Sequence, residues 1–127
     1  MAKLIPDAIL DDMLGVIADA ADRVDICSTQ PTTYAEATDT YSLGDVTLNA
    51  GAGNGDWTLA NGDTNGRKLT MAQQTGVTID ASGTAAHIAV TNGSDTLLAV
   101  TTCTSQAVTS GNTATINAFD IEISDAS

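Results

Sequence analysis

Two patterns of apolar residues divide this chain near residue 27. Between Pro6 and about Arg23, apolar residues recur every three or four positions, which is the spacing of one face of an α-helix. Pro6 suits the first helical turn, because the N–H that it lacks would have no helical partner there. Arg23 lies near the other end, where the helix dipole favours a positive charge. We therefore predict one helix over this segment.

The predicted helix carries one apolar stripe, on which its packing depends. Gly15 lies in the middle of the helix and weakens it by about 1 kcal/mol relative to alanine. The helix therefore needs a surface to pack on, either the rest of its own chain or a neighbouring subunit. The stripe expected to make that contact consists of Ile9, Met13, Val16 or Ile17, Ala20 and Val24.

After residue 27, apolar and polar residues alternate, as they do in strands that are buried on one face. The clearest case is the last one, in which Phe119, Ile121 and Ile123 point one way while Asp120 and Glu122 point the other. Residues 97–100 are apolar on both faces, as in a central strand. Strands are predicted at residues 24–27 and around 45–49, 56–60, 68–71, 77–80, 86–91, 97–100 and 119–124.

Glycine-containing dipeptides separate the predicted strands and indicate hairpin turns with positive φ. They are Asn54-Gly55, Asn61-Gly62, Asn65-Gly66, Ser82-Gly83, Asn92-Gly93 and Ser110-Gly111. Short strands at this spacing predict a mainly β fold, a β-sandwich or jelly-roll-like set of antiparallel sheets with one N-terminal α-helix. We expect an N-terminal arm and helix over residues 1–25 and a β-sandwich domain over residues 26–127, folding as a single unit.

The amino-acid composition indicates a small hydrophobic core and an acidic chain. Leu, Ile, Val and Phe together number 26 of 127 residues, and the net charge is −12. A thin core favours an oligomer, because subunits then bury further apolar surface against one another. The basic residues, Lys3, Arg23, Arg67 and Lys68, are too few to neutralise a phosphate backbone. We therefore expect no nucleic-acid partner.

The sequence also bears on the compartment. No segment approaches the roughly 20 apolar residues of a membrane helix, and Asp7, Asp11 and Asp12 interrupt any apolar run of a secretory signal. We expect no membrane partner and synthesis in a cytoplasm. Two cysteines, Cys27 and Cys103, do not make a disulfide framework. Reduced thiols are the expectation, with a Cys27–Cys103 bridge as the alternative.

His87 is the one histidine and the natural starting point for a search for catalysis. A Ser–His–Asp arrangement could use Ser82 or Ser94 with Asp80 or Asp95, but no nucleophile-elbow pattern surrounds these serines. His87 lies in a predicted strand among small apolar residues, which favours a structural or interface histidine. We therefore expect no enzyme, and keep a small hydrolase as the least favoured alternative.

Three oxygen-rich segments bear on metal and sugar chemistry. Asn54-Gly55-Asp56 and Asn61-Gly62-Asp63 resemble pieces of calcium loops, but no segment matches an EF-hand or a nonapeptide calcium repeat. Asp120 and Glu122 share a strand face, as the paired acids of glycosidases can, yet aromatic platforms for sugars are scarce. Hairpin turns and a solvated face explain these residues better, and we expect no metal and no cofactor.

Several segments resemble small proteins encoded among the virion genes of tailed bacteriophages and prophages. The resemblance covers nearly the whole chain and implies a cement or decoration protein on the capsid exterior, bound to the major capsid protein, with virion localisation after synthesis in the host bacterial cytoplasm. It also implies a homo-oligomer, for which a trimer matches the local threefold points of a shell. The segments are residues 3–11, 26–37, 66–69, 80–89, 97–103 and 119–123.

Two regions hold three of the four basic residues next to apolar neighbours, and they are the predicted contacts with the capsid. The residues are Lys3, Leu4, Ile5 and Pro6 in the N-terminal segment, and Arg67, Lys68 and Leu69 in a predicted turn region. Pairing of Arg67 and Lys68 with carboxylates of the same chain is the alternative interpretation. A tail-tip or fibre module that recognises a host surface ligand is the alternative function.

Overall fold

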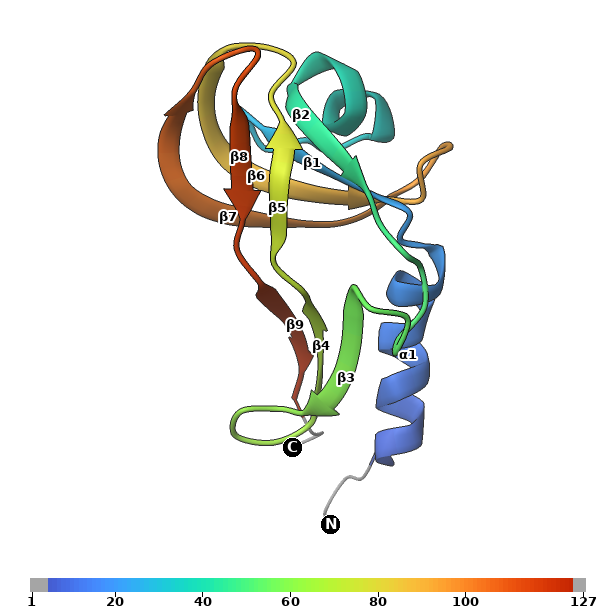
Figure 1. The fold of residues 1–127 in the computed structure, drawn as a ribbon. Helices are drawn as coiled ribbons and strands as arrows, with labels where there is room; N and C mark the ends of the chain where they lie inside the picture. Colours follow the sequence, from blue (N-terminus) through green and yellow to red (C-terminus); the bar gives the residue numbers. More distant parts are fainter. Residues whose placement is uncertain (1–4, 125–127) are drawn as a thin grey trace.

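The computed structural model describes residues 5–124 and shows antiparallel β-sheets with one N-terminal helix (Figure 1), as predicted. Helix α1 spans Asp7–Ala20, directly after Pro6. It ends before the predicted Arg23, because Arg23 is already the first residue of strand β1 (Arg23–Cys27). The backbone N–H of Ala21 closes the helix by donating to the Ala18 carbonyl.

One layer is a four-stranded antiparallel sheet in the order β2-β1-β6-β7. Strand β2 spans Ser42–Thr47, β6 spans Gly83–Thr91 and β7 spans Leu97–Val108. A short π-helix, η1 (Glu36–Thr40), lies between β1 and β2 in the chain. Strands β2 and β7 form the two edges of this sheet.

The other strands form two smaller ladders that continue one another. Strands β3 (Trp57–Asn61), β4 (Arg67–Met71) and β9 (Phe119–Ile123) pair in the order β3-β4-β9, and β5 (Gln74–Thr78) pairs with β8 (Thr113–Ile116). The segment β4–β5 therefore runs antiparallel to β8–β9, from the end near α1 to the four-stranded sheet (Figure 1).

The two layers are joined along one side and open along the other. Gly44 of β2 forms a bridge with Ile79, and the N–H groups of Asp80 and Ala81 both donate to the Leu43 carbonyl. A Cβ at Gly44 would collide with the Thr78 carbonyl, so this close approach requires glycine. Within residues 5–124 no ladder joins β7 to β8 on the opposite side. The arrangement is sandwich-like and is not a closed barrel.

One main hydrophobic core joins the helix and the strands. Trp57, Leu69 and Met71 of the smaller sheet are fully buried, and they share this core with Val24 of the larger sheet and Leu14 of α1. Burial of such side chains is worth about 1.5–3 kcal/mol each. Because α1 supplies part of the core, the helix and the sheets stabilise each other.

Strand β7 extends beyond its predicted end, and β8 was missed altogether. The prediction placed a central strand at residues 97–100, whereas β7 continues to Val108 and lies at the edge of its sheet. Strand β8 covers Thr113–Ile116. Both missed stretches are rich in threonine and alanine, so few large apolar residues mark the alternation. Threonine nevertheless suits a strand, because its branched Cβ fits the pleated surface.

The predicted packing stripe of α1 was wrong in its first half. The alternative residue Ile17 is half-buried against the core, and Val24 is fully buried, although it belongs to β1. The side chains that pack on the sheets are Leu10, Leu14 and Ala18, hereafter the inner stripe, and all three are buried. The predicted residues Ile9, Met13 and Val16, hereafter the outer stripe, face solvent instead. Apolar residues cover a wide arc of this helix, and helical spacing alone cannot tell which half of the arc meets the sheet.

The prediction of positive φ was right at four of the six glycines, which are Gly55, Gly66, Gly93 and Gly111. The prediction of hairpin turns was right for Gly66 and Gly93 but wrong for Gly55 and Gly111, because β2 does not pair with β3 and β7 does not pair with β8. The prediction of positive φ was wrong for Gly62 and Gly83, which are not among the positive-φ glycines. Gly62 is required for another reason, since a Cβ there would collide with the Asn65 carbonyl. Gly83 is the first residue of β6.

Candidate functional site

The outer stripe of α1 is the most conspicuous apolar surface of the described chain. Ile9 and Met13 are each 49% exposed and Val16 is 69% exposed, and these are the exposed large hydrophobic residues among residues 5–124. They lie at i, i+4 and i+7, so they share one helix face. Exposed Asp12 and Asp19 flank that face on one side. Clustered apolar side chains rimmed by charge are typical of protein contact sites.

An ion pair between Arg67 and Asp11 orients α1 against the sheet. The Arg67 Nε donates to Asp11 Oδ1 at 2.7 Å, and Arg67 Nη1 donates to Asn61 Oδ1 at 2.7 Å. The hydrogen bond with Asp11 raises the pKa of Arg67 above its ordinary value. This contact ties the helix to β4 while the inner stripe is buried, and it leaves the outer stripe facing outward.

The other predicted contact residues of β4 also face partners within the chain. Lys68 Nζ lies 2.8 Å from Asp63 Oδ1 and 3.6 Å from Asp120 Oδ2, and the bond with Asp63 raises the pKa of Lys68. Leu69 is fully buried in the core. The charges of Arg67 and Lys68 are therefore neutralised internally, which is the alternative interpretation of the basic pair.

The N-terminal candidates lie next to α1, as far as the structure describes them. Ile5 is half-buried and Pro6 is exposed, and the Pro6 carbonyl accepts hydrogen bonds from the first turn of the helix. Lys3 and Leu4 lie outside the described residues. Ile5 and Pro6 therefore lie at the N-terminal end of the helix that carries the outer stripe.

A buried carboxylate, which the sequence analysis did not single out, joins three elements. Asp25 of β1 is fully buried and accepts two hydrogen bonds from Arg23, at 2.7 and 2.8 Å, and one from the Ser42 hydroxyl at 2.6 Å. Arg23 also donates to the Thr38 carbonyl of η1 at 3.2 Å. The bond with Asp25 raises the pKa of Arg23. Because these groups satisfy one another, this network is structural.

His87 does not lie in a catalytic arrangement of the kind considered. Its ring is half-buried, and Nδ1 is buried without a hydrogen-bond partner. Two of the residues considered as its partners bond elsewhere, since Ser82 Oγ accepts from the Ser110 N–H and Asp95 Oδ1 accepts from the Asn92 side chain. These contacts stabilise turns and do not assemble a triad.

The two cysteines are free thiols rather than a bridge. Cys27 is buried beside η1, where its Sγ lies 3.4 Å from the Ala37 carbonyl. Burial raises the pKa of Cys27 to about 12, and burial also raises the pKa of half-buried Cys103. Both thiols therefore stay protonated at neutral pH, which is unfavourable for a nucleophile.

The carboxylates of the acidic turns interact with other residues of the same chain. Asp56 accepts from the Asn49 N–H at 2.7 Å and from the Gln74 side chain at 3.0 Å, while Asp63 pairs with Lys68. Among residues 5–124, no three His, Cys, Asp or Glu side chains come together to hold a metal ion. These contacts stabilise the β3–β4 hairpin at Asp63 and the loop before β3 at Asp56.

The acidic pair of the last strand is exposed and already hydrogen-bonded. Asp120 accepts from the Thr70 hydroxyl at 2.6 Å, and Glu122 accepts from the Asp63 N–H at 2.9 Å. Both residues lie on the polar face of β9, as the alternation predicted. Their contacts join neighbouring strands and a turn.

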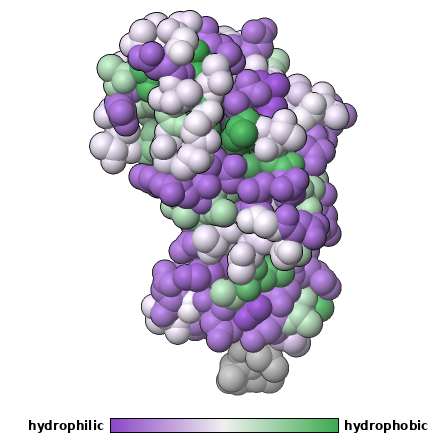
Figure 2. Space-filling model, viewed as in Figure 1, coloured by the Kyte–Doolittle hydropathy of each residue, from purple (hydrophilic) through white to green (hydrophobic). Residues whose placement is uncertain are grey.

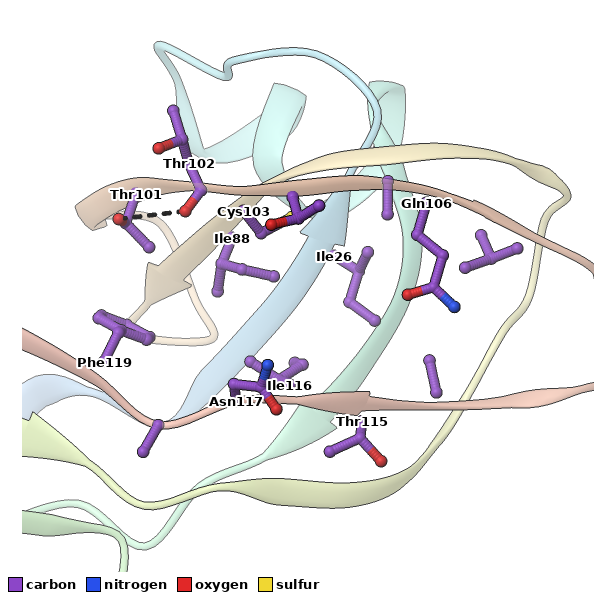
Figure 3. Close-up of a pocket in the computed structure, with 15 residues that line it drawn as sticks. Ile26, Ile88, Thr101, Thr102, Cys103, Gln106, Thr115, Ile116, Asn117 and Phe119 are labelled. Carbon is purple, nitrogen blue, oxygen red and sulfur yellow. Dashed lines mark hydrogen bonds between the residues drawn. The ribbon is translucent and has the colours of Figure 1, made fainter.

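A groove of about 350 Å³ opens between β7 and the β8–β9 segment, on the unjoined side of the two layers (Figure 3). Ile26 and Ile88 of the larger sheet, Cys103 of β7, and Ile116 and Phe119 of the facing segment supply its apolar lining. No charged side chain lines it. This surface, hereafter the open groove, was not anticipated from the sequence. The sequence feature that could have indicated this groove is the run of 24 uncharged residues from Thr96 to Phe119.

On the face that Figure 2 shows, hydrophilic residues are widespread and the hydrophobic residues form small separate groups. Within residues 5–124, no helix combines the length and the apolar character that crossing a bilayer requires. Comparison with protein-family models, with curated proteins and with solved structures found no match to this chain.

Proposed function

We propose that this chain is a non-enzymatic structural protein of a tailed-phage virion, a cement or decoration protein that binds the outside of the capsid. The observation that carries the proposal is the outer stripe of α1, Ile9, Met13 and Val16, exposed on an ordered helix. The viral setting derives from the sequence resemblance alone. The stripe supports the mode of action, because such a protein works through contact surfaces.

The chemistry of the stripe specifies the partner surface. Its three apolar side chains require an apolar patch, and the acidic flank of Asp12 and Asp19 favours basic residues at the rim of that patch. The partner proposed is the major capsid protein. Ile5 and Pro6 extend the contact towards the N-terminus, whereas Arg67 contributes by holding α1 in place.

The strongly negative charge supports the same role. A net charge of −12 keeps free subunits apart before they attach, and it opposes adsorption to packaged or free DNA. All three basic side chains within residues 5–124 are engaged by carboxylates of the same chain. The chain therefore offers excess negative charge to a basic rim on its partner.

The test uses particles of the encoding phage that were assembled without this chain. Purified full-length protein is added, and bound protein is measured after sedimentation of the particles. Met13→Asp places a charge in the outer stripe and should weaken binding by about tenfold or more, since it puts a carboxylate into an apolar contact. Thr58→Asp adds the same charge to an exposed position on β3, outside α1, and should bind like the wild type.

Equal binding of Met13→Asp and the wild-type protein would rule out the outer stripe as the contact. Immunogold labelling of intact virions gives a separate answer about location. Label over heads supports the proposal, and label over tails contradicts it in favour of the tail-module alternative.

A further inference from the structure

The free edge of β7 is the surface that carries a second inference. Strand β7 is the longest strand, with 12 residues, and it pairs only with β6 on one side. Within residues 5–124, no ladder or bridge uses its other side. Unpaired N–H and C=O groups along such an edge are a template for another strand.

This edge lacks charge and proline, two features that usually block strand addition. Proteins protect exposed edges with charged side chains, proline, very short strands or β-bulges. The ladder of β7 with β6 shifts register between Ala85 and His87 and between Val90 and Thr91, so the strand is irregular at these two places. Residues 97–108 contain no charged residue and no proline. Four successive side chains near the end of the strand, residues 104–107, are exposed, so neither layer covers this part of β7.

The open groove lies directly beside this edge. Cys103 of β7 faces Ile116 and Phe119 across the groove, with Ile26 and Ile88 at its base (Figure 3). Phe119 remains only half-buried, and so does Cys103. A polypeptide added to the edge of β7 would cover this lining and would pair the free backbone groups at the same time.

The distribution of charged residues along the chain indicates that a second copy can bind at this surface. Twenty charged residues are spread over the 127-residue chain, with 16 acids against four bases, so two copies repel each other across most of their surfaces. The segment from Thr96 to Phe119 is the longest run without a charged residue, and the open groove has no charged lining. Here a second copy can approach without like-charge contact.

We propose that two copies of this chain associate through antiparallel pairing of their β7 edges about a two-fold axis. Identical edges satisfy this geometry, because each copy presents the same donors and acceptors to the other. The contact would continue the β2-β1-β6-β7 sheet into the second copy and bring the two open grooves together. It gives a dimer, in place of the trimer expected from shell symmetry, and it does not rest on the proposed function.

The test exploits the midpoint of the strand. A two-fold axis at the middle of β7 passes near Thr102 and Cys103, so each Thr102 lies close to its own copy in the partner. Thr102 is exposed. Thr102→Lys and Thr102→Glu should each raise the dimer dissociation constant by about tenfold, because like charges then face each other across the pair. An equimolar mixture of the two variants should restore the dimer.

Molar mass by light scattering and native mass spectrometry of the full chain supply the readout. Thr58→Lys and Thr58→Glu are the matched controls, because Thr58 is exposed on β3, an edge strand of the other sheet, and these variants should remain dimeric. Circular dichroism verifies that each variant is folded. A short bis-maleimide should also join Cys103 to Cys103 between copies, and Cys103→Ser should abolish this product.

Three outcomes would overturn the inference. They are a monomeric wild-type protein at all concentrations tested, an oligomer whose mass Thr102→Lys and Thr102→Glu leave unchanged, and loss of the dimer for only one sign of charge. The last result would show that each Thr102 faces a different, charged surface. Because these measurements use free protein, they are independent of capsid binding, and either proposal can fail alone.

Discussion

Gly66 shows how backbone geometry determines the identity of a single residue. It adopts a φ of +72°, and a Cβ there would collide with the Ile123 carbonyl at the end of β9. The turn before β4 can therefore approach β9 only with glycine at this position. The Asn-Gly dipeptide indicated the positive φ, whereas the contact with a residue 57 positions later is known only from the fold.

We predict that Gly66→Ala destabilises the protein more than Gly76→Ala. Gly76 also has positive φ, at +66°, but open space surrounds its would-be Cβ. Gly76→Ala should cost about 1–2 kcal/mol for the left-handed backbone alone, and Gly66→Ala should exceed that cost because of the added collision. Urea unfolding of both variants measures the difference. Equal losses of stability would contradict the close approach at Gly66.

Cys27 links burial to pH dependence. Its pKa is raised from 9.0 to about 12 by burial, so the folded protein keeps the thiol protonated where the unfolded chain has lost the proton. The native state then binds more protons than the unfolded state, and stability falls as pH rises from about 9 to 12. We predict a smaller loss of unfolding free energy across this range in Cys27→Ala than in wild type.

The measurement is the slope of unfolding free energy against pH, because the cavity left by Cys27→Ala lowers stability at every pH. Cys103→Ala is the control, since Cys103 is only half-buried and its pKa is raised less strongly. Parallel slopes for the wild-type protein and Cys27→Ala would show that this thiol is not protected from ionisation.

At the scale of one element, α1 carries two apolar stripes with different tasks. The inner stripe packs into the core, and the outer stripe remains exposed at neighbouring positions of the same turns. The ion pair of Arg67 with Asp11 is consistent with this orientation. A helix that only covered its own sheet would need just one of the two stripes.

We predict opposite results for truncation of the two stripes. Leu14→Ala removes a side chain that is 1% exposed and should cost about 2–5 kcal/mol of unfolding free energy. Met13→Ala, at 49% exposure, should change it by less than about 0.5 kcal/mol. Thermal and urea unfolding provide the comparison. A large loss in Met13→Ala would place the outer stripe in a contact already formed by the free protein.

For the whole molecule, repulsion between carboxylates opposes compactness, and the thin hydrophobic core supplies only a small opposing stabilisation. The ion pairs of Arg23, Arg67 and Lys68 engage a minority of the 16 carboxylates, so most acidic side chains contribute to repulsion. The open groove adds to this imbalance, because part of the apolar interior lacks a cover in a single copy. Both observations agree with a protein that gains stability on assembly.

We predict that salt raises the melting temperature. Raising sodium chloride from about 0.05 M to about 0.5 M shortens the distance over which carboxylates repel one another, while the short internal ion pairs are screened less. Differential scanning calorimetry at constant protein concentration measures the shift, with potassium chloride as the control for ion identity. A lower melting temperature at high salt would mean that the ion pairs outweigh the repulsion.

Alternation of side chains indicated most strands, and the last strand alternates as predicted, because Phe119, Ile121 and Ile123 face the core side. The positions of the helix and of four turn glycines also followed from local rules. These features depend on neighbours in the chain, which a sequence displays directly.

Contacts between distant residues were decided by the tertiary structure. Helical spacing could not choose between the inner and outer stripes, because that choice depends on where β4 presents Arg67 to Asp11, 56 residues away. The burial of Leu69, the network around Asp25 and the open groove arise in the same way, from strands that meet only after folding. Local periodicity specifies elements and their apolar faces, whereas only packing decides which of those faces remain free for a partner.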